Sequence, residues 1–199
     1  MRREIFDVVG CDARVGFWRA DVETHGEIVQ VVTRADTGAL VPYALPVQKS
    51  ERGGGGLFCS ARNFVRILQD LIAPEPKILT HAARDVLFGP QLADDSTALT
   101  QLRASAPMFT AITGPLTAGL PPSAINHALG GLLITQDSGL GKTSGTMAWA
   151  GAYSCPWFAN RESGVVAFYG SGVFPPTDAK SSELMGRFVG EVWRRVGKD

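Results

Sequence analysis

The sequence lacks both an excess of one charge and a long apolar run. Its 199 residues include 19 Lys and Arg and 19 Asp and Glu, so the formal net charge is zero. Without a basic stripe, neither nucleic acid nor an anionic membrane surface is expected as a partner. No apolar run reaches the ~18 residues of a membrane span, and the opening MRREIFDVVG does not have the pattern of a secretory signal. We therefore expect a soluble, cytoplasmic protein.

Cysteine is scarce as well. Cys11, Cys59 and Cys155 are odd in number, and their spacing matches no metal-binding motif. Free cysteines are usually buried, so we expect three reduced thiols in the core. Neither a metal nor another cofactor is expected from this sequence.

The apolar content that is present supports one domain over 1–199. Hydrophobic residues make up 45% of the chain, which is enough to bury a core. We divide the chain into a helix and hairpin over 1–56, a helical excursion over 57–127, and a sheet with a C-terminal helix over 128–199. That last helix, predicted over 178–196, carries an apolar stripe wide enough to lie on a sheet. The predicted class is therefore α+β, with an antiparallel sheet covered by helices.

Local signals predict the other elements. Ser60 and Thr80 are predicted N-caps of two helices, the second of which ends at Phe88. The Pro, Gly and Thr content of 107–122 predicts a loop that is long enough to form the rim of a pocket. Further segments with helical or strand character are 2–9, 27–33, 39–43, 94–105 and 128–135.

The stretch 145–170, GTMAWAGAYSCPWFANRESGVVAFYG, combines two runs of β-forming residues with a central turn. Residues 148–158 and 165–169 flank 159–164, whose Asn and Gly favour a turn, so an antiparallel hairpin is predicted. Gly151 interrupts the first strand. A strand surface without bulk is found where a ligand or another backbone comes close, although a bulge or a tight packing contact is the simpler explanation.

Two glycine-rich segments call for an interpretation. Gly53 to Gly56 directly precede the helix that Ser60 caps, so this run is either a structural turn or part of a pocket wall. Residues 139–143, GLGKT, resemble the end of a phosphate-binding loop. The first glycine of that motif would fall at Gln136, and strand-like rather than helical sequence follows, so nucleotide binding is not expected.

Residues 149–160, WAGAYSCPWFAN, resemble the third conserved element of the class C β-lactamase-like serine hydrolases. That superfamily includes carboxylesterases with a W-x-G motif and fungal acyltransferases such as the lovastatin-pathway transesterase. Residues 53–64, GGGGLFCSARNF, are similar to its G-G-G-x-x-S-T-A-x-D-[FY] segment, and 5–11, IFDVVGC, resemble its I-F-x-P-L-G-M helix end. The final helix also fits, so the similarity spans nearly the whole chain.

The resemblance implies a partial β-lactamase or transpeptidase-like fold and acyl-transfer chemistry. In this family a Ser of an S-x-x-K motif attacks the acyl group, and a Tyr of a Y-x-N motif helps to move the proton. No serine in this sequence has Lys at the third position after it, and none of the three tyrosines has Asn two residues on. Both motifs precede the matched segments in the family. This chain therefore resembles the C-terminal half to two-thirds of such an enzyme.

The resemblance also implies which residues would meet the acyl group. The backbone N–H of Ala152 matches one of two oxyanion donors, and Gly151 would let the acyl group pass. Trp149 stands where β-lactamases have the Lys of K-T-G, which favours the esterase or transesterase branch, while Lys142 with Thr143 and Ser144 is a rival match. The candidate oxyanion-hole and pocket residues are Trp149, Ala150, Gly151, Ala152 and Tyr153, with Gly55 and Gly56 as candidate pocket wall.

Three functions are compatible with these features. The first is an acyltransferase or esterase of secondary metabolism that acts on a small acyl ester or thioester, with its nucleophile outside this chain. The alternative is a non-catalytic binding or accessory module derived from the same fold. The third is a re-tooled enzyme with another nucleophile or base, for which the residues to consider are Cys59, Cys155, Ser154, His81 and His127.

These five residues are expected to be structural. The two thiols lie in apolar contexts where cysteines are usually inert, and no histidine has Asp or Glu at a spacing that marks a dyad.

A sheet without its first strands would expose an apolar face. We therefore expect either a complementary N-terminal chain or a homo-oligomer.

Overall fold

The computed structural model describes residues 1–45 and 53–196, and its centre is a five-stranded antiparallel sheet. The strands lie in the order β5-β6-β7-β8-β9, each pairing antiparallel with the next one along the chain. Their bounds are Ile125–His127, Leu132–Ile134, Met147–Trp149, Trp157–Asn160 and Val165–Phe168. β5 and β9 are therefore the two edges of this sheet.

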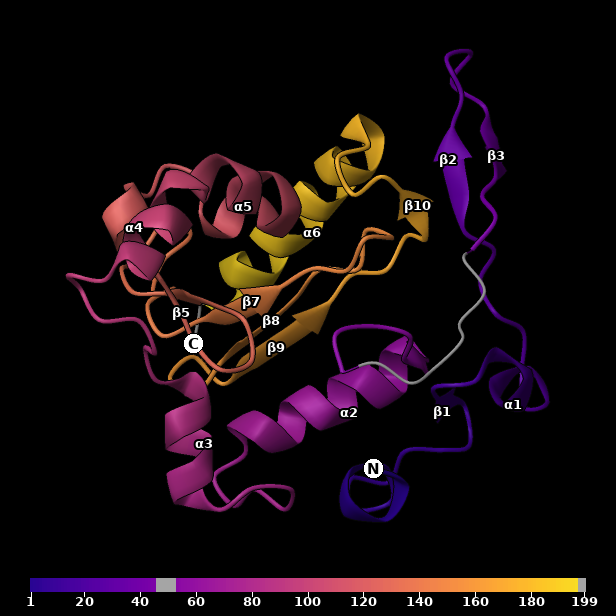
Figure 1. Cartoon of the computed structure of the whole chain (residues 1–199), viewed down its shortest axis with the longest axis horizontal. Helices are drawn as coiled ribbons and strands as arrows, with labels where there is room; N and C mark the ends of the chain where they lie inside the picture. Colours follow the sequence, from indigo (N-terminus) through magenta and orange to yellow (C-terminus); the bar gives the residue numbers. More distant parts are fainter. Residues whose placement is uncertain (46–52, 197–199) are drawn as a thin grey trace.

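Helices cover both faces of the central sheet (Figure 1). On one face, Phe158 of β8 shares a buried cluster with Trp193 of α6 (Ala179–Val196). The next residue, Ala159, faces the cluster on the side of α2 (Ala61–Ile72). Successive side chains of a strand point to opposite faces, so β8 and β9 pack against helices on both faces. The α+β class and the predicted C-terminal helix are confirmed.

Two small sheets extend the fold beyond the central one. β1 (Val15–Gly16) pairs with β4 (Phe58–Cys59). β10 (Val173–Phe174) pairs in parallel with β2 (Val32–Arg34), and β2 pairs antiparallel with β3 (Leu40–Pro42). The hairpin predicted from 27 to 43 is present, but its first strand begins at residue 32. The early helix predicted over 2–9 is a π-helical turn, η1 (Arg2–Phe6), and α1 (Arg19–Glu23) follows it.

The predicted helix caps are confirmed. Ser60 accepts a hydrogen bond of 3.2 Å from an N–H of the first turn of α2, and Thr80 does the same for α3 (His81–Phe88), also at 3.2 Å. Ser96 caps α4 (Thr97–Ala104) in the same way at 3.1 Å. Each cap satisfies an N–H that the helix itself cannot pair. Among the helices of the described residues, none has the length and apolar content needed to cross a bilayer.

The prediction of a loop over 107–122 is wrong. This segment is mostly helical, with α5 (Ala106–Thr113) followed by the 3-10 turns η2 (Gly114–Leu116) and η3 (Pro122–Ala124). Pro107 lies in the first turn of α5, where a missing N–H costs nothing. The threonines bond back to the helix, as in the 2.7 Å bond from the Thr113 hydroxyl to the Phe109 carbonyl. Residues that usually favour loops therefore sit at helix positions that tolerate them.

One predicted strand is divided in two and another is shorter than predicted. Residues 148–158 belong to β7 and β8, with 150–156 connecting them, so the predicted hairpin is the pair β8 and β9 alone. The segment 128–135 contains only β6, because Gly131 lies in a turn that presses on β7. A Cβ at Gly131 would lie 2.7 Å from the Ala148 carbonyl oxygen. The space available for side chains at these turns determines where the strands end. The β-propensity of the sequence did not reveal those ends.

One partly buried ion pair joins the early hairpin to the last helix. Arg34 of β2 donates two hydrogen bonds, of 2.7 and 3.0 Å, to the carboxylate of Asp178, which also accepts the Ser181 N–H at 2.9 Å. The hydrogen bond from Arg34 is the main cause that lowers the pKa of Asp178 below its ordinary value. Asp178 therefore caps α6 and ties it to β2 while it is ionised.

Replacing Asp178 by Ala should lower the free energy of unfolding at pH 7, by about 1 kcal/mol from the lost cap alone. Because the folded pKa is depressed, this contribution is complete above the unfolded pKa and is lost as pH falls through the folded pKa. Urea unfolding at pH 7 and pH 3 measures both effects. Asp85→Ala, which breaks an exposed pair with Arg161, is the matched control and should have less effect at both pH values. An equal effect of Asp178→Ala at both pH values would contradict the assignment.

Candidate functional site

The predicted site lies in the connection that follows β7. Residues 150–156 form a closed turn, in which the Gly151 N–H donates to the Cys155 carbonyl at 3.4 Å. The Tyr169 N–H donates to the Pro156 carbonyl at 2.9 Å and fixes the end of the turn against the chain after β9. A Cβ at Gly151 would lie 3.6 Å from that of Cys155, an ordinary packing distance. The segment is thus a turn of defined conformation at the end of a central strand.

Ser154 anchors this turn. Its φ is +52°, a left-handed conformation that is uncommon for residues other than glycine. The buried hydroxyl donates to the Val173 carbonyl at 2.8 Å, and the Ser154 carbonyl accepts the Ser171 N–H at 3.2 Å. The hydroxyl is therefore committed to holding the turn against β10, which argues against Ser154 as a nucleophile.

Trp149 forms one wall beside the turn. Its ring lies 6.0 Å from that of Phe109 in α5 and 5.7 Å from that of His127 in β5, measured between ring centroids. His127 Nδ1 bonds to the Ala128 carbonyl, so Nδ1 is the donor and Nε2 is left as an acceptor in the neutral ring. An indole held by two neighbouring rings is a rigid apolar surface.

Tyr153 meets a second set of aromatic rings on the other side of the turn. Its ring centroid is 6.2 Å from that of Phe174, which in turn stacks on Tyr43 at 4.6 Å. The turn is therefore flanked by aromatic side chains at both ends. Sequence reasoning missed Phe109, Phe174 and Tyr43, because each reaches the turn through tertiary packing. The available sequence signal for Phe109 was the proline in the first turn of α5, the helix that carries this residue.

Ala150 and Ala152 carry amides that are available to a ligand. Within the described residues neither backbone N–H has a hydrogen-bond acceptor, and Ala152 is exposed. The pairing of β7 with β6 stops at Ala148, so the chain beyond it has left that ladder. Unpaired amides that are fixed by the surrounding fold can polarise a carbonyl as negative charge develops on its oxygen. Ala152, the predicted oxyanion donor, lies on a turn rather than on the predicted strand.

The other residues considered as nucleophile or base are placed less favourably. Burial raises the pKa of Cys59 to about 12 and also raises that of Cys155, so both thiols stay protonated near neutral pH. His81 Nε2 lies 3.3 Å from the carboxylate of Glu75, a partner six residues earlier in the chain that the sequence spacing did not indicate. Both side chains of that pair are largely exposed, and they belong to the α2–α3 corner.

The remaining predicted segments have structural roles in the described chain. The Thr143 hydroxyl accepts the Ser138 N–H at 2.7 Å and donates to the Gln136 carbonyl, and the strand β7 follows, so 139–143 is a closed turn before a strand. Gly55 and Gly56 are exposed in the approach to β4. A Cβ at Gly55 would meet nothing within 4 Å, so no neighbouring group requires a glycine there, and the role of Gly55 and Gly56 as a pocket wall stays a prediction.

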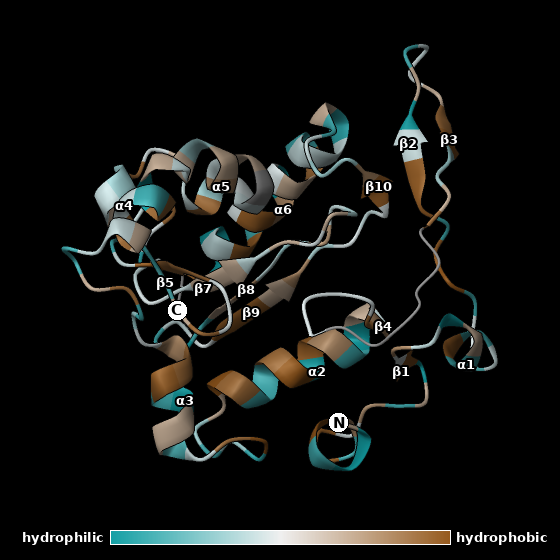
Figure 2. Ribbon diagram, viewed as in Figure 1, coloured by the Kyte–Doolittle hydropathy of each residue, from teal (hydrophilic) through white to brown (hydrophobic). Residues whose placement is uncertain are grey.

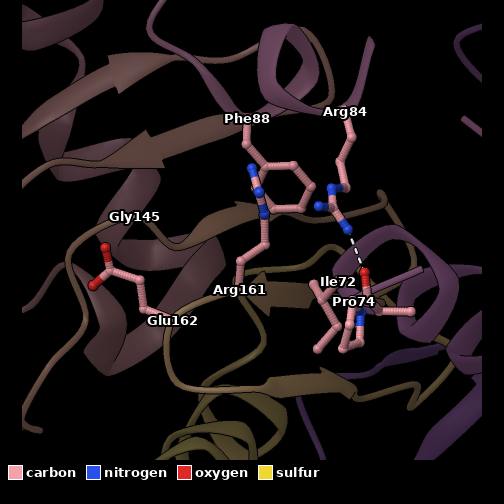
Figure 3. A pocket seen from close by; sticks show the side chains of 8 residues that line it. Ile72, Pro74, Arg84, Phe88, Gly145, Arg161 and Glu162 are labelled. Atoms are coloured by element: carbon pink, nitrogen blue, oxygen red, sulfur yellow. Dashed lines mark hydrogen bonds between the residues drawn. The ribbon is translucent and has the colours of Figure 1, made fainter. Parts of the chain in front are cut away.

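A hollow of about 540 Å³ lies away from this turn, at the corner between α2 and α3. Figure 3 shows Arg84 and Arg161 reaching into it from either side of Phe88, with Glu162 further along the rim. Arg84 donates to the Ala73 carbonyl, but its buried Nε has no partner in the structure. Arg161 lies 5.7 Å from the Phe88 ring centroid and pairs with Asp85.

Curated proteins with similar sequences are fungal enzymes. Acyltransferase CalJ of Penicillium decumbens is 28% identical over 175 residues, which cover 86% of this chain and 41% of that protein. Lovastatin esterase of Penicillium rubens is 27% identical over 146 residues, which cover 72% of this chain and 35% of that protein. No family model matches the chain.

Solved structures with a similar fold are also enzymes of acyl transfer or hydrolysis. Simvastatin synthase (LovD) of Aspergillus terreus superposes with a TM-score of 0.80 at 18% identity, covering 100% of this chain and 49% of that one. EstCE1, a hydrolase with promiscuous acyltransferase activity, superposes with a TM-score of 0.62 at 14% identity, covering 95% and 49%.

Fold and comparisons together define an α+β chain that matches about half of a β-lactamase-like fold. The chain is a homologue of acyltransferase CalJ and of lovastatin esterase, as the motif resemblance predicted, and it shares the fold of about half of simvastatin synthase. It spans about half the length of these proteins or less.

Proposed function

We propose that this chain contributes the acyl-polarising part of an acyltransferase or esterase of the serine-hydrolase type in secondary metabolism. The single observation that supports this most strongly is the pair of unpaired amides, on Ala150 and Ala152, at the end of β7. Homology to an acyltransferase and an esterase supports the same reaction class. The substrate is a small acyl ester or thioester.

The proposed chemistry assigns a role to each part of the turn. The substrate carbonyl oxygen accepts the Ala152 N–H, and the negative charge that forms on this oxygen during attack strengthens that hydrogen bond. Trp149 and Tyr153 shield the acyl group from water on either side, since both are flanked by packed rings. The attacking hydroxyl comes from polypeptide outside residues 1–199, since no S-x-x-K motif occurs in this sequence.

Co-expression with a polypeptide that carries the attacking hydroxyl tests the proposal. The partner is the part of the Penicillium decumbens acyltransferase that this chain does not match, and the assays are hydrolysis of acyl esters and thioesters and labelling by a fluorophosphonate. We expect no turnover from this chain alone and turnover with labelling of the partner when both are present. Labelling of a residue of this chain, or a co-purified pair that is inactive toward all acyl donors, would overturn it.

A binding module without catalysis is the second candidate, and the α2–α3 hollow favours it. Arg84 is 6% exposed and has no acidic partner among the described ion pairs, so its charge is available to a carboxylate or similar anion. Calorimetric titration with small carboxylates, comparing wild type with Arg84→Met, distinguishes this candidate. Binding that is lost in the variant, together with no turnover in the co-expression assay, would support it.

A further inference from the structure

The connection that follows β9 fixes the turn 150–156. The Ser154 carbonyl accepts the Ser171 N–H at 3.2 Å, and the buried Ser154 hydroxyl donates to the Val173 carbonyl at 2.8 Å. Ser154 has a φ of +52°, and such a conformation persists in a residue other than glycine only where the surrounding structure determines it. The shape of the turn therefore depends on residues 171–173.

Ser171 extends this support to α6. It has a glycine on either side, so its hydroxyl is the only polar side-chain group in the sequence between Tyr169 and Val173. That hydroxyl lies 2.9 Å from the Ser181 hydroxyl in the first turn of α6, and it accepts the Val173 N–H at 3.4 Å. Figure 2 shows this connection in pale colours between the hydrophobic strands β9 and β10. A single hydroxyl therefore bridges the connection and the helix.

Ser181 provides a firm attachment for this bridge. It is 7% exposed, and its N–H donates at 2.9 Å to the carboxylate of Asp178, which pairs with Arg34. The Ser181 carbonyl accepts the Tyr169 hydroxyl at the longer distance of 3.4 Å. Polar networks whose members are paired make the structure around them rigid. The hydroxyl of Ser171 thus joins the turn to a well-anchored helix end.

We propose that Ser171 is a positioning residue for the acyl-polarising amide of Ala152, which it holds in place through Ser154. The inference rests on the proposed function, because that function is what gives the Ala152 N–H a substrate to meet. Ala152 lies only two residues before Ser154. The Gly151 N–H donates to the Cys155 carbonyl at 3.4 Å, so the first half of the turn is tied to the half that Ser171 supports.

The expected effect is on kcat rather than on KM. The hydrogen bond from an oxyanion donor strengthens as charge develops in the transition state, so a misplaced donor mainly slows the chemical step. A displacement of about 1 Å can cost about 10²-fold in rate. Loosening of the turn without unfolding of the sheet should therefore be visible in the rate.

Removal of the hydroxyl tests this role in the co-expressed complex with an acyl thioester. Ser171→Ala deletes the bridge to α6 and keeps the backbone bond to Ser154, and Ser171→Thr restores a hydroxyl. Ser163→Ala is the matched control, since it removes a 3.1 Å bond to the Lys142 carbonyl at the opposite end of β8 and β9. We expect Ser171→Ala to lower kcat about tenfold or more with little change in KM. Ser171→Thr and Ser163→Ala should both stay near wild type, with similar thermal midpoints throughout.

Amide exchange in the isolated chain gives a readout that does not depend on catalysis. The Gly151 N–H should exchange about tenfold faster in Ser171→Ala than in wild type, because the turn that it closes is loosened. The Ile134 N–H, which donates to the Thr146 carbonyl at 2.9 Å beside the central sheet, should not change. An unchanged Gly151 exchange rate, full kcat in Ser171→Ala, or an equal loss in Ser163→Ala would each overturn the proposal.

The positioning role and the proposed function can fail separately. If Ala152→Pro lowers kcat and Ser171→Ala does not, the proposed function stands and the role of Ser171 is rejected. If the complex is inactive toward all acyl donors while Gly151 exchange still responds to Ser171→Ala, the bridge to α6 stands and the proposed function is rejected.

Discussion

Replacing Trp193 by Ala should destabilise the protein by about 3 to 5 kcal/mol, the cost of removing a large aromatic side chain from a packed core. Trp193 is 2% exposed, and its indole stacks on Phe158 with ring centroids 5.8 Å apart and planes at 18°. It joins α6 to β8 in the cluster on that face of the sheet. The cavity left by alanine would separate helix from sheet. The free energy of urea unfolding at pH 7 measures the loss.

Trp193→Phe is the matched control, and it separates packing from polarity. The buried indole Nε1 has no hydrogen-bond partner among the described residues, so phenylalanine removes an unpaired donor while it keeps most of the ring. We expect this variant to lose less than about 1.5 kcal/mol, the usual limit for a swap that nearly conserves volume. Equal losses in the alanine and phenylalanine variants would show that the indole N–H, rather than the stacking on Phe158, stabilises this layer.

Replacing Ala152 by Pro should lower kcat/KM for acyl transfer by about 10²- to 10³-fold, the usual cost of removing one oxyanion donor. Proline deletes the N–H that has no acceptor within the described chain. Ala152 is exposed and lies outside the strand ladders, so the substitution leaves the sheet intact. The rate is measured in the co-expressed complex with an acyl thioester, next to the thermal midpoint of each variant.

Ala152→Gly keeps the amide and removes only a methyl group, so its rate should stay within a few-fold of wild type. A proline variant that retains full activity would show that this N–H does not meet the substrate. Equal loss of rate in both variants would point to the methyl group or the shape of the turn instead. Together the pair distinguishes a hydrogen bond to the substrate from general packing around residues 150–156.

Elements with a local signal were predictable from the sequence. Ser60 and Thr80 cap helices because a hydroxyl can reach an N–H two or three residues on, and that geometry needs no distant partner. The spacing of apolar residues likewise predicted α6. By contrast, the segment 107–122 contains the proline, glycine and threonine of a typical loop, and its helix depends on packing of Phe109 against the sheet.

The motif around Trp149 indicated which segment to consider as a site, and its assignment as an oxyanion hole stays a prediction. The prediction had placed this segment on a strand, whereas the chain turns after Trp149 because β8 pairs directly with β7. The rings of Phe109, His127 and Phe174 come from parts of the chain 21 to 40 residues away. No single-sequence pattern links residues at such separations.

The parallel pairing of β2 with β10 has a consequence for how the protein is made. Arg34 and Asp178 are 144 positions apart, so the early hairpin meets its partner strand only when nearly all of the described chain has been synthesised. At typical translation rates of about 5 to 20 residues per second, the 144 positions between them take roughly 7 to 29 seconds to synthesise, and β2 and β3 lack this partner strand during that time. During that interval the exposed Leu40 and Val41 are available to chaperones, and the pairing of β2 with β10 is a late step in folding.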